Sequence, residues 1–492
     1  MPRTKKKSQL DTGYGPPLFR HQRHSIEFLS SRPRALDFSD PGTGKTRTEI
    51  EDFARRRRAG GGKALIIAPK SLLRSAWEDD FKKYAPDMKV SVAPAEKRAQ
   101  AFAEEADAYV TNTDAAKWLA QQKPAFFKDF ETLIIDELST FKHHTSQRSK
   151  AMNKIKKYFP YRRGLTGTPN ANSITDLWHQ VFIIDDGQRL GRSFYQFRNS
   201  VCQPTQVGPQ PNMLKWEDKP GAELAVSHLL ADITIRHKFE ECIDIPENHM
   251  YSVPYHMSKK QILAYAQMEK AAIAQLANGQ LVTALNAAGV MTKLLQIASG
   301  AAYGEAAVKG SANPNEVIPR MARAKLLNEP EPYVVVDRGR YELVADLAEQ
   351  RQHSVVFFNW THQRDELIKE FTSRKITFAV IDGTTPDKER KNIVDQYQNG
   401  FYRVLLAHPQ SAAHGLTLTR GEATIWASPT YNLEHFLQGN RRIYRAGQTK
   451  RTETIVVLAP GTVEEKVFQK LQDKDAKQTS VLNLLKELFH EQ

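Results

Sequence analysis

"DFSDPGTGKTRTEI", residues 37–50, runs from an apolar stretch that predicts a β-strand into a stretch that predicts an α-helix. Gly42 and Gly44, at the turn between the two, allow successive backbone N–H groups to converge on phosphate oxygens. Lys45 can reach the β- and γ-phosphates of a nucleotide, and the Thr46 hydroxyl can bind Mg²⁺. The turn therefore predicts a phosphate-binding site at the start of a helix. Its predicted nucleotide-binding residues are Asp40, Gly42, Thr43, Gly44, Lys45 and Thr46.

The strict phosphate-loop pattern differs from this chain at one position, where Ser39 replaces a glycine. A glycine-rich turn before an ordinary helix is therefore the alternative interpretation. The strand expected before the turn and the helix expected after it favour the phosphate-binding interpretation, because such a site is built from both.

A second stretch, "TLIIDELS" (residues 132–139), predicts a buried strand that ends in an acidic pair, Asp136 and Glu137. Open α/β sheets bind ligands at the carboxyl ends of their parallel strands, where this pair would lie. Asp136 and Thr46 can hold Mg²⁺, and Glu137 can orient and deprotonate an attacking water. An acidic pair alone is more often a helix N-terminus. Combined with the phosphate-binding turn, it predicts hydrolysis of ATP with Mg²⁺, with Lys45, Asp136 and Glu137 as catalytic residues.

Short apolar runs separated by helical patterns recur along most of the chain, which is typical of βαβ units and parallel sheets. A polar, proline-rich stretch at 201–221 and an Ala/Leu/Gln-rich helical pattern at 258–300 interrupt this alternation. We therefore predict the α/β class, with two parallel-sheet lobes and a helical segment between them. The expected strands are 35–39, 63–69, 108–112, 132–137 and 162–168 in the first lobe, and 354–360, 376–383, 403–408, 422–429 and 453–460 in the second.

The predicted domain boundaries follow from these changes of pattern. Residues 1–15 form a basic N-terminal tail, 16–235 the first lobe, 236–330 the inter-lobe segment with a helical insertion, and 331–492 the second lobe. Apolar residues at helical spacing within the last thirty positions predict two amphipathic helices that pack on the second lobe.

Charge and cysteine content narrow the class of protein. Lysine and arginine number 70 against 56 acidic residues, a formal net charge of +14, which favours a polyanionic partner. No apolar run approaches the ~20 residues that span a bilayer, so no membrane contact is expected. Cys202 and Cys242 form no zinc-binding pattern and suit a reducing compartment. We expect an intracellular protein, cytoplasmic in a bacterial host or phage-infected cell and nuclear in a eukaryote.

Several stretches, in order, resemble the motifs of superfamily-two helicase-like ATPases, and specifically those of Swi/Snf-type DNA translocases. They include "LFRHQRHSIEFL" (18–29), "IIAPKSLLRSAWEDDFKKY" (66–84), "LTGTPNANSITDLW" (165–178), "VVFFNWTHQRDEL" (355–367) and "GTVEEKVF" (461–468). The resemblance covers roughly residues 16–470 and implies two RecA-like lobes, in a compact bacterial or phage-like form of the family. It also implies that Gln22 reads the adenine edge of ATP.

Residues 438–450, "QGNRRIYRAGQTK", concentrate arginines without an acidic residue among them. In the family this motif lies on the second lobe and faces the ATP held by the first. The resemblance therefore implies that Arg442 and Arg445 are arginine fingers, and that Gln438 and Gln448 help to sense the γ-phosphate. Arg441 stands where the family usually has an acidic residue and is expected to be a solvated surface residue.

Polar residues at the expected strand ends are candidates for contacts with nucleic-acid phosphates. For each of them a loop-capping role is an equal alternative. The candidates are Lys70, Ser71, Thr111, Asn112, Thr361 and Thr384. The resemblance of "SAAHGLTLT" (411–419) to a DNA-facing loop of the family adds Gly415 and Thr417. The arginine run 55–58 also suggests a DNA contact, but we expect it to be the cationic end of the helix that follows the phosphate-binding turn.

Together these features predict a DNA-dependent ATPase that couples hydrolysis to movement along duplex DNA and remodels DNA or protein–DNA complexes. Contacts to phosphates would make its binding sequence-tolerant and salt-sensitive. Partner proteins are expected to supply targeting, because no reader module is recognised. The alternatives are a strand-separating helicase acting on DNA or RNA and, in a different class, an ATP-binding nucleic-acid clamp without turnover.

Overall fold

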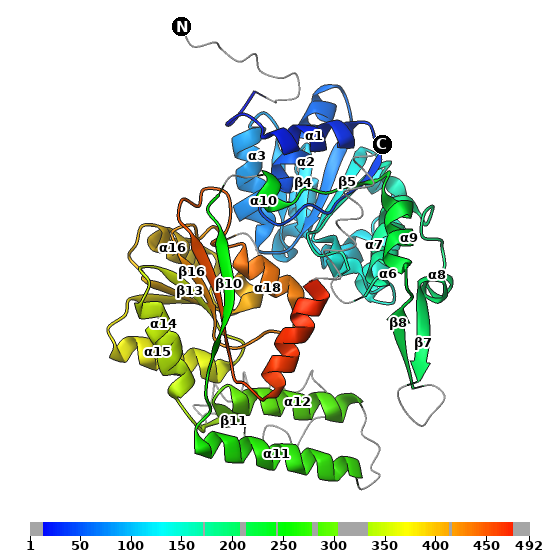
Figure 1. Ribbon diagram of the computed structural model, residues 1–492. Coiled ribbons are helices and arrows are strands. Elements are labelled where there is room, and N and C mark those ends of the chain that lie inside the picture. The colour runs from blue at the N-terminus through cyan, green and yellow to red at the C-terminus, as the bar shows by residue number, and fades with distance from the viewer. Residues whose placement is uncertain are drawn as a thin grey trace. The chain divides into compact units, whose positions relative to one another are not determined.

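The computed structural model describes residues 13–170, 173–206, 213–242, 245–277, 284–303, 333–412 and 416–475. The chain divides into two compact units, one formed by residues 1–244 with 473–492 and the other by residues 245–472. Each unit contains a parallel β-sheet against which helices pack (Figure 1). Two parallel-sheet units with flanking helices confirm the predicted α/β fold class.

The first unit is built around seven parallel strands in the order β3-β4-β2-β5-β6-β1-β9. Successive side chains of β2 point to opposite faces of the sheet. Leu65 and Ile67 lie in the hydrophobic core on one face, and Ala64 and Ile66 lie in the core on the other. Continuous apolar strands of this kind belong to a sheet covered on both faces. The strands are β1 (Arg34–Asp37), β2 (Lys63–Ala68), β3 (Val90–Ala93), β4 (Ala108–Asn112), β5 (Phe130–Asp136), β6 (Tyr161–Leu165) and β9 (Thr234–Ile235).

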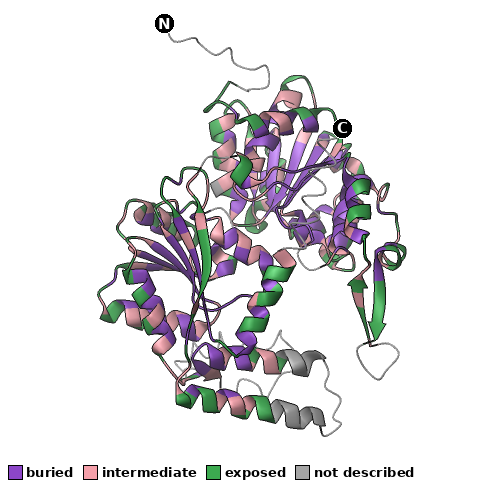
Figure 2. Cartoon of the chain, in the orientation of Figure 1, coloured by how far each residue is buried: buried purple, intermediate pink, exposed green. Residues whose placement is uncertain are grey.

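Helices surround this sheet and have exposed outer faces, whereas the strands of the sheet are mostly buried (Figure 2). The helices are α1 (Arg20–Ser30), α2 (Lys45–Arg58), α3 (Asp79–Tyr84), α4 (Arg98–Ala103), α5 (Ala115–Leu119), α6 (Gln147–Ile155), α7 (Asp176–Asp185), α8 (Phe194–Val201), α9 (Ala222–Leu230) and α10 (Phe239–Cys242). A π-helix, η1 (Leu73–Glu78), precedes α3, and short 3-10 turns are η2 (Ala95–Lys97), η3 (Pro124–Phe127), η4 (Leu138–Phe141) and η5 (Lys156–Tyr158). An antiparallel hairpin of β7 (Cys202–Gln206) and β8 (Leu214–Asp218) follows α8.

The arginine run 55–58 forms the last turn of α2, as expected. Each of its guanidinium groups contacts a carboxylate of the same unit. The pairs are Arg55–Asp52 at 3.2 Å, Arg56–Asp52 at 3.2 Å, Arg57–Asp107 at 2.8 Å and Arg58–Asp87 at 2.7 Å. These arginines therefore neutralise acidic residues of the first unit, which supports the structural interpretation over a DNA contact.

The second unit contains six parallel strands in the order β10-β17-β16-β13-β15-β14. They are β10 (Asn248–Pro254), β13 (Ser354–Phe357), β14 (Phe378–Ile381), β15 (Val404–Ala407), β16 (Ala423–Trp426) and β17 (Thr452–Leu458). The helices are α11 (Lys259–Ala277), α12 (Ala284–Ala298), α14 (Gly339–Glu349), α15 (Thr361–Ser373), α16 (Asp387–Gln398), α17 (Pro409–Ala412) and α18 (Leu433–Asn440), and residues 463–475 are also helical. A short antiparallel pair, β11 (Ala301–Tyr303) and β12 (Tyr333–Val335), lies between α12 and α14.

All ten expected strands are present, each end within three residues of its predicted position, but three further strands of the two parallel sheets were not predicted. β3 and β9 are short edge strands, and β10 is an edge strand with mostly exposed side chains, so none carries the apolar run of a central strand. Because β10 pairs with β17, the stretch 248–303 belongs to the second unit, and the division at 244/245 differs from the predicted boundaries at 235 and 330. Val463 and Val467 join the core of the second unit, as expected, whereas the tail 1–12 and residues 476–492 lie outside the described residues.

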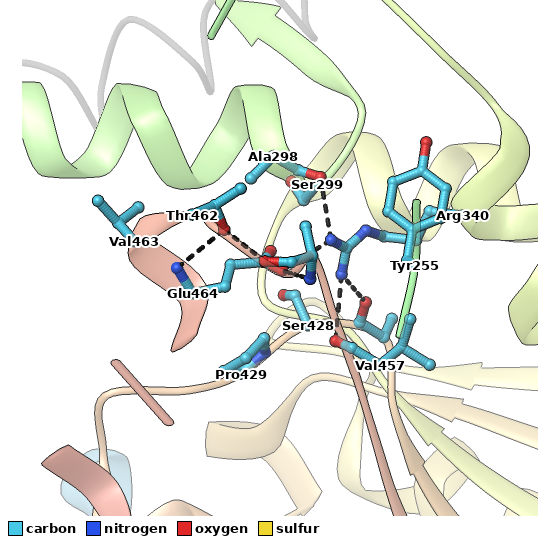
Figure 3. Close-up of polar contacts among 12 residues, drawn as sticks. Tyr255, Ala298, Ser299, Arg340, Ser428, Pro429, Val457, Thr462, Val463 and Glu464 are labelled. Carbon is cyan, nitrogen blue, oxygen red and sulfur yellow. Dashed lines mark hydrogen bonds and ion pairs between the residues drawn. The ribbon is translucent and has the colours of Figure 1, made fainter. Parts of the chain in front are cut away.

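A buried ion pair joins α14 to the C-terminal helix of the second unit (Figure 3). Arg340 and Glu464 are both fully buried, and their side chains meet at 2.7 Å. Arg340 also donates to the carbonyl oxygens of Ala298, Ala427 and Val457. A buried charge is tolerated only when it is paired and hydrogen-bonded in this way, so Arg340 connects α14 to α12, β16, β17 and the C-terminal helix.

Candidate nucleotide site

The turn 39–46 lies at the carboxyl end of β1 and leads into α2, as the sequence predicted. Gly42 and Gly44 have φ of 90° and 84°, a region that favours glycine. A Cβ at Gly44 would collide with Nε2 of Gln22, whose Oε1 accepts a hydrogen bond from the Phe19 amide at 3.1 Å. The structure thus brings the predicted adenine reader, Gln22, against the phosphate-binding turn.

Lys45 folds back over the turn that carries it. Its Nζ donates to the carbonyl oxygens of Ser39 at 2.6 Å and Asp40 at 3.1 Å, and the Thr43 hydroxyl donates to the same Asp40 carbonyl at 2.9 Å. Carbonyl oxygens carry partial charges only, so an incoming phosphate is a stronger partner for the ammonium group. Thr46 follows on the first turn of α2 and is half-buried.

The acidic pair lies at the end of β5, two strands from β1 in the same sheet. Asp136 accepts hydrogen bonds on both oxygens, from Trp77 Nε1 at 2.9 Å and from the Glu137 amide at 3.1 Å. Burial raises the pKa of the Asp136 carboxyl above its usual range, against the opposing effects of the Trp77 hydrogen bond and the Lys45 charge. Glu137 has a left-handed backbone with φ of 55°, a strained conformation that is common at functional sites.

A segment that the sequence analysis did not assign to the site also contacts the turn. Arg236 pairs with the Asp40 carboxylate at 3.2 Å, the Phe239 amide donates to the same carboxylate at 3.1 Å, and the His237 amide donates to the Ser39 hydroxyl at 3.0 Å. Ser39, which replaces the glycine of the strict pattern, therefore accepts a hydrogen bond for which glycine has no side chain. No local signal links residue 236 to residue 40, because the contact depends on the pairing of β9 with β1.

The motif at 165–178 also reaches the turn. A Cβ at Gly167 would lie 2.7 Å from Cδ of Pro41, so the two loops pack closely, and the Thr166 amide donates to the Asp37 carbonyl at 3.1 Å. Asn172 of this motif lies outside the described residues.

In the second unit, the segment 438–450 forms the end of α18 and the loop after it. Arg442 Nε donates to the Gln438 carbonyl at 2.7 Å, and Arg445 donates to the Leu416 carbonyl at 2.9 Å. Gln438 is buried, and its amide donates to Glu434 at 3.3 Å.

Gln448, which is predicted to help sense the γ-phosphate, is bonded within its own loop. Its Nε2 is within hydrogen-bonding distance of the carbonyl oxygens of three residues, and its Oε1 accepts from two backbone amides. The buried amide is therefore committed to holding its own loop, and contact with a phosphate would require these bonds to break.

The predicted nucleic-acid contacts divide by exposure. Lys70 is exposed, with its Nζ 3.9 Å from Glu96, and Ser71 is half-buried beside it. Thr111 is fully buried and donates to the Ala93 carbonyl, which contradicts a direct contact with DNA, and Asn112 is buried and accepts from Arg98 at 2.7 Å. In the second unit Thr361 is half-buried and Thr384 and Thr417 are exposed, whereas Gly415 lies outside the described residues.

A metal-binding cluster and a membrane-spanning helix each have structural requirements with which the described residues can be compared. In the part of the chain that the structure describes, no cluster of three or more histidine, cysteine, aspartate or glutamate side chains could hold a metal ion. Within the same described ranges, no helix has the length and apolar character that crossing a bilayer requires.

Comparisons with known proteins agree with this arrangement. The model of the SNF2-related domain matches residues 21–299, and that of the helicase conserved C-terminal domain matches residues 339–447. Protein p41 of the Acyrthosiphon pisum secondary endosymbiont phage 1 is 27% identical, over 95% of this chain and 98% of its own length. An uncharacterized ATP-dependent helicase of Mycoplasma genitalium is 24% identical over 87% of this chain, which spans only 38% of that protein. Among solved structures, the Sulfolobus solfataricus SWI2/SNF2 ATPase core in complex with dsDNA is 20% identical, covers 97% of this chain and 96% of its own, and has a TM-score of 0.43.

Proposed function

Because the chain belongs to the SNF2-related family and is a helicase-like ATPase, we propose that it couples ATP hydrolysis to translocation along duplex DNA. The observation that carries the proposal is the meeting of the phosphate-binding turn and the acidic pair at one edge of the first sheet, where Lys45 lies near enough to lower the pKa of Asp136 against the effect of burial. A metal-assisted attack on a γ-phosphate needs these groups together.

The residues of the turn fit a nucleoside triphosphate with Mg²⁺. A side chain at position 44 would fill the space beside Gln22, so only glycine leaves the backbone open to phosphate oxygens. The Thr46 hydroxyl and the Asp136 carboxylate are the hard oxygen donors that Mg²⁺ prefers. When bound, the metal would neutralise charge on the transferred phosphoryl group.

The side chains of this chain would divide the remaining work. Lys45 would exchange its carbonyl partners for phosphate oxygens, and Glu137 would accept the proton of the attacking water. Arg442 and Arg445 of the second unit would stabilise the charge that develops in the transition state, with Gln438 beside them. Since these arginines belong to the other unit, hydrolysis would depend on the approach of the two units.

Duplex DNA is the partner that the charge and the exposed polar turns support. The net charge is +14, and Lys70, Ser71, Thr361, Thr384 and Thr417 are candidates for phosphate contacts. Asn112 remains a weaker candidate because its side chain is bound to Arg98. We propose that binding is sequence-tolerant, that partner proteins supply targeting, and that the protein works in the compartment that holds its DNA, the cytoplasm in a bacterial host.

The test is the ATPase rate of the full chain with and without duplex DNA, for the wild type and for Lys45→Ala and Glu137→Gln. We expect duplex DNA to raise the wild-type rate at least tenfold and both variants to lose nearly all turnover. Displacement of a triplex-forming strand without separation of a forked duplex identifies a translocase, whereas fork separation identifies a helicase. DNA binding with no ATP hydrolysis in the wild type would favour the clamp and contradict the proposal.

A further inference from the structure

A π-helix connects an exposed turn of the first unit to the metal-site carboxylate. The helix η1 spans Leu73–Glu78 and continues into α3. Such wide turns are rare and occur frequently at functional sites. Here the wide turn carries Trp77, which is fully buried and donates its indole N–H to Asp136 at 2.9 Å.

Both oxygens of Asp136 are oriented by donors of the chain itself. Oδ2 accepts from Trp77 and Oδ1 accepts from the backbone amide of Glu137. A donor that holds a metal-binding carboxylate in place contributes to metal affinity although it does not touch the metal, and its loss typically costs ~10–100-fold. Trp77 occupies this position for Asp136.

The other end of the segment faces solvent. Lys70 and Ser71 lie in the turn after β2, which the Leu72 amide closes by donating to the Pro69 carbonyl at 2.9 Å. Leu72 and Leu73 are then buried in the same core as Trp77. A displacement of the turn is therefore transmitted through packed side chains, because a close-packed core does not absorb it locally.

We propose that Trp77 is a positioning residue for Asp136, and that η1 couples nucleic-acid contact at the Lys70–Ser71 turn to the nucleotide site. The inference rests on the proposed function for its two ligands, Mg²⁺ with ATP and duplex DNA. It adds a route within the first unit by which DNA changes the metal site.

The first experiment measures binding rather than turnover. Trp77→Phe keeps the aromatic ring and removes the N–H donor. For binding of a fluorescent ATP analogue, we expect the Mg²⁺ concentration at half-saturation to rise ~10-fold, while affinity in EDTA stays within about twofold. Trp118→Phe is the matched control, because Trp118 packs on Phe102 and Phe126 in the same unit, and it should change neither value. An unchanged Mg²⁺ requirement in Trp77→Phe would overturn the positioning role.

A second variant, which keeps the shape of tryptophan, provides the test if Trp77→Phe does not fold. β-(3-benzothienyl)alanine at position 77 places sulfur where the N–H was, and it should reproduce the ~10-fold shift if the phenylalanine variant unfolds. An unchanged Mg²⁺ requirement with this residue would equally overturn the positioning role.

The second experiment tests the coupling with a double-mutant cycle on the ratio of ATPase rates with and without duplex DNA. We expect Lys70→Ala to lower this ratio at least threefold in the wild type and to have little further effect in Trp77→Phe. Independent effects of the two changes, or no effect of Lys70→Ala in the wild type, would overturn the coupling. If the wild type shows no DNA-stimulated hydrolysis, the proposed function and the coupling both fail, while the Mg²⁺ titration still decides the role of Trp77.

Discussion

Two arginine-rich segments of this chain look alike in sequence and differ in what their guanidinium groups contact. The run 55–58 at the end of α2 meets carboxylates at 2.7 to 3.2 Å. In the segment 441–445, Arg442 and Arg445 donate to backbone carbonyl oxygens. A carbonyl dipole is a weaker partner for a guanidinium group than a carboxylate is, so a phosphate can take its place at these two contacts. The partner that an arginine contacts is therefore determined by the fold around it and not by the local composition.

The largest expected effect tests the second segment. Arg445→Ala should lower the DNA-stimulated ATPase rate by ~10³-fold or more, because a finger arginine acts on charge that appears only in the transition state. Arg441→Ala, a neighbour in the same loop, should leave the rate within about threefold. If Arg445→Ala lowered the ATPase rate by less than tenfold, the role of Arg445 would be structural, like that of the arginines at 55–58.

The next largest effect is expected for Arg340, an arginine of the second unit that is paired with a carboxylate as the run 55–58 is. Arg340→Met leaves Glu464 buried without its ion-pair partner and should destabilise the unit by about 3–5 kcal/mol. Denaturant unfolding of the full chain, followed by hydrogen exchange in β16 and β17, measures it. Arg340→Met combined with Glu464→Leu should recover much of the loss, because no buried charge then remains. A single variant as stable as the wild type would contradict the importance of the pair.

A third test concerns Glu49, a buried acidic residue of α2, the helix that ends in the run 55–58. Burial raises the pKa of Glu49 on α2 to about 8, against the charge of Arg163, whose Nε lies 4.0 Å from the carboxylate. Between its ordinary pKa of 4.5 and about 8, the folded chain holds a proton that the unfolded chain has released. Stability should therefore fall as pH rises through this window, by roughly 1 kcal/mol per pH unit for this group.

Glu49→Gln replaces the titratable carboxyl with a neutral amide. The difference between the two proteins therefore isolates the contribution of Glu49 to the pH dependence of stability. Relative to the wild type, the variant should gain stability steadily from pH 5 to pH 8 in urea unfolding. Parallel stability curves for the two proteins would show that Glu49 is ionised in the folded state across this range.

The smallest effect belongs to the exposed end of the first segment. Arg58→Ala removes a surface pair with Asp87 and should cost less than about 1 kcal/mol. Duplex affinity and its dependence on salt should not change. A salt dependence weaker by about one phosphate contact would instead identify Arg58 as a DNA-binding residue.

The predictable parts of this molecule are those in which one strand or turn carries the whole signal. Central strands such as β2 and β5 are continuous apolar runs, and the glycines of the turn specify its backbone conformation locally. Edge strands such as β10 are exposed and lack that pattern. The roles of Arg236 and Trp77 depend on contacts across 196 and 59 positions, which no local pattern reveals.

Burial argues against Thr111 as a nucleic-acid contact and weakens the case for Asn112. Thr111 and Asn112 end a strand, as many functional residues do, but they turn into the protein. Gln448 matches its motif in identity and position, yet its amide is occupied by its own loop. A motif specifies which residue stands at a position, and only the surrounding packing specifies where its side chain points.

The contacts of Ser39 and Asp40 with residues 236–239 have a mechanical consequence. The chain passes from the first unit to the second directly after this segment, which is fastened to the phosphate-binding turn by an ion pair and backbone hydrogen bonds. A pull along the polypeptide would therefore act first on the turn that we propose binds the nucleotide. If the proposed translocation runs against a load, we expect the lifetime of the bound nucleotide to depend on the applied force. Single-molecule records of dwell times under assisting and opposing loads would reveal that dependence, and Arg236→Met should weaken it.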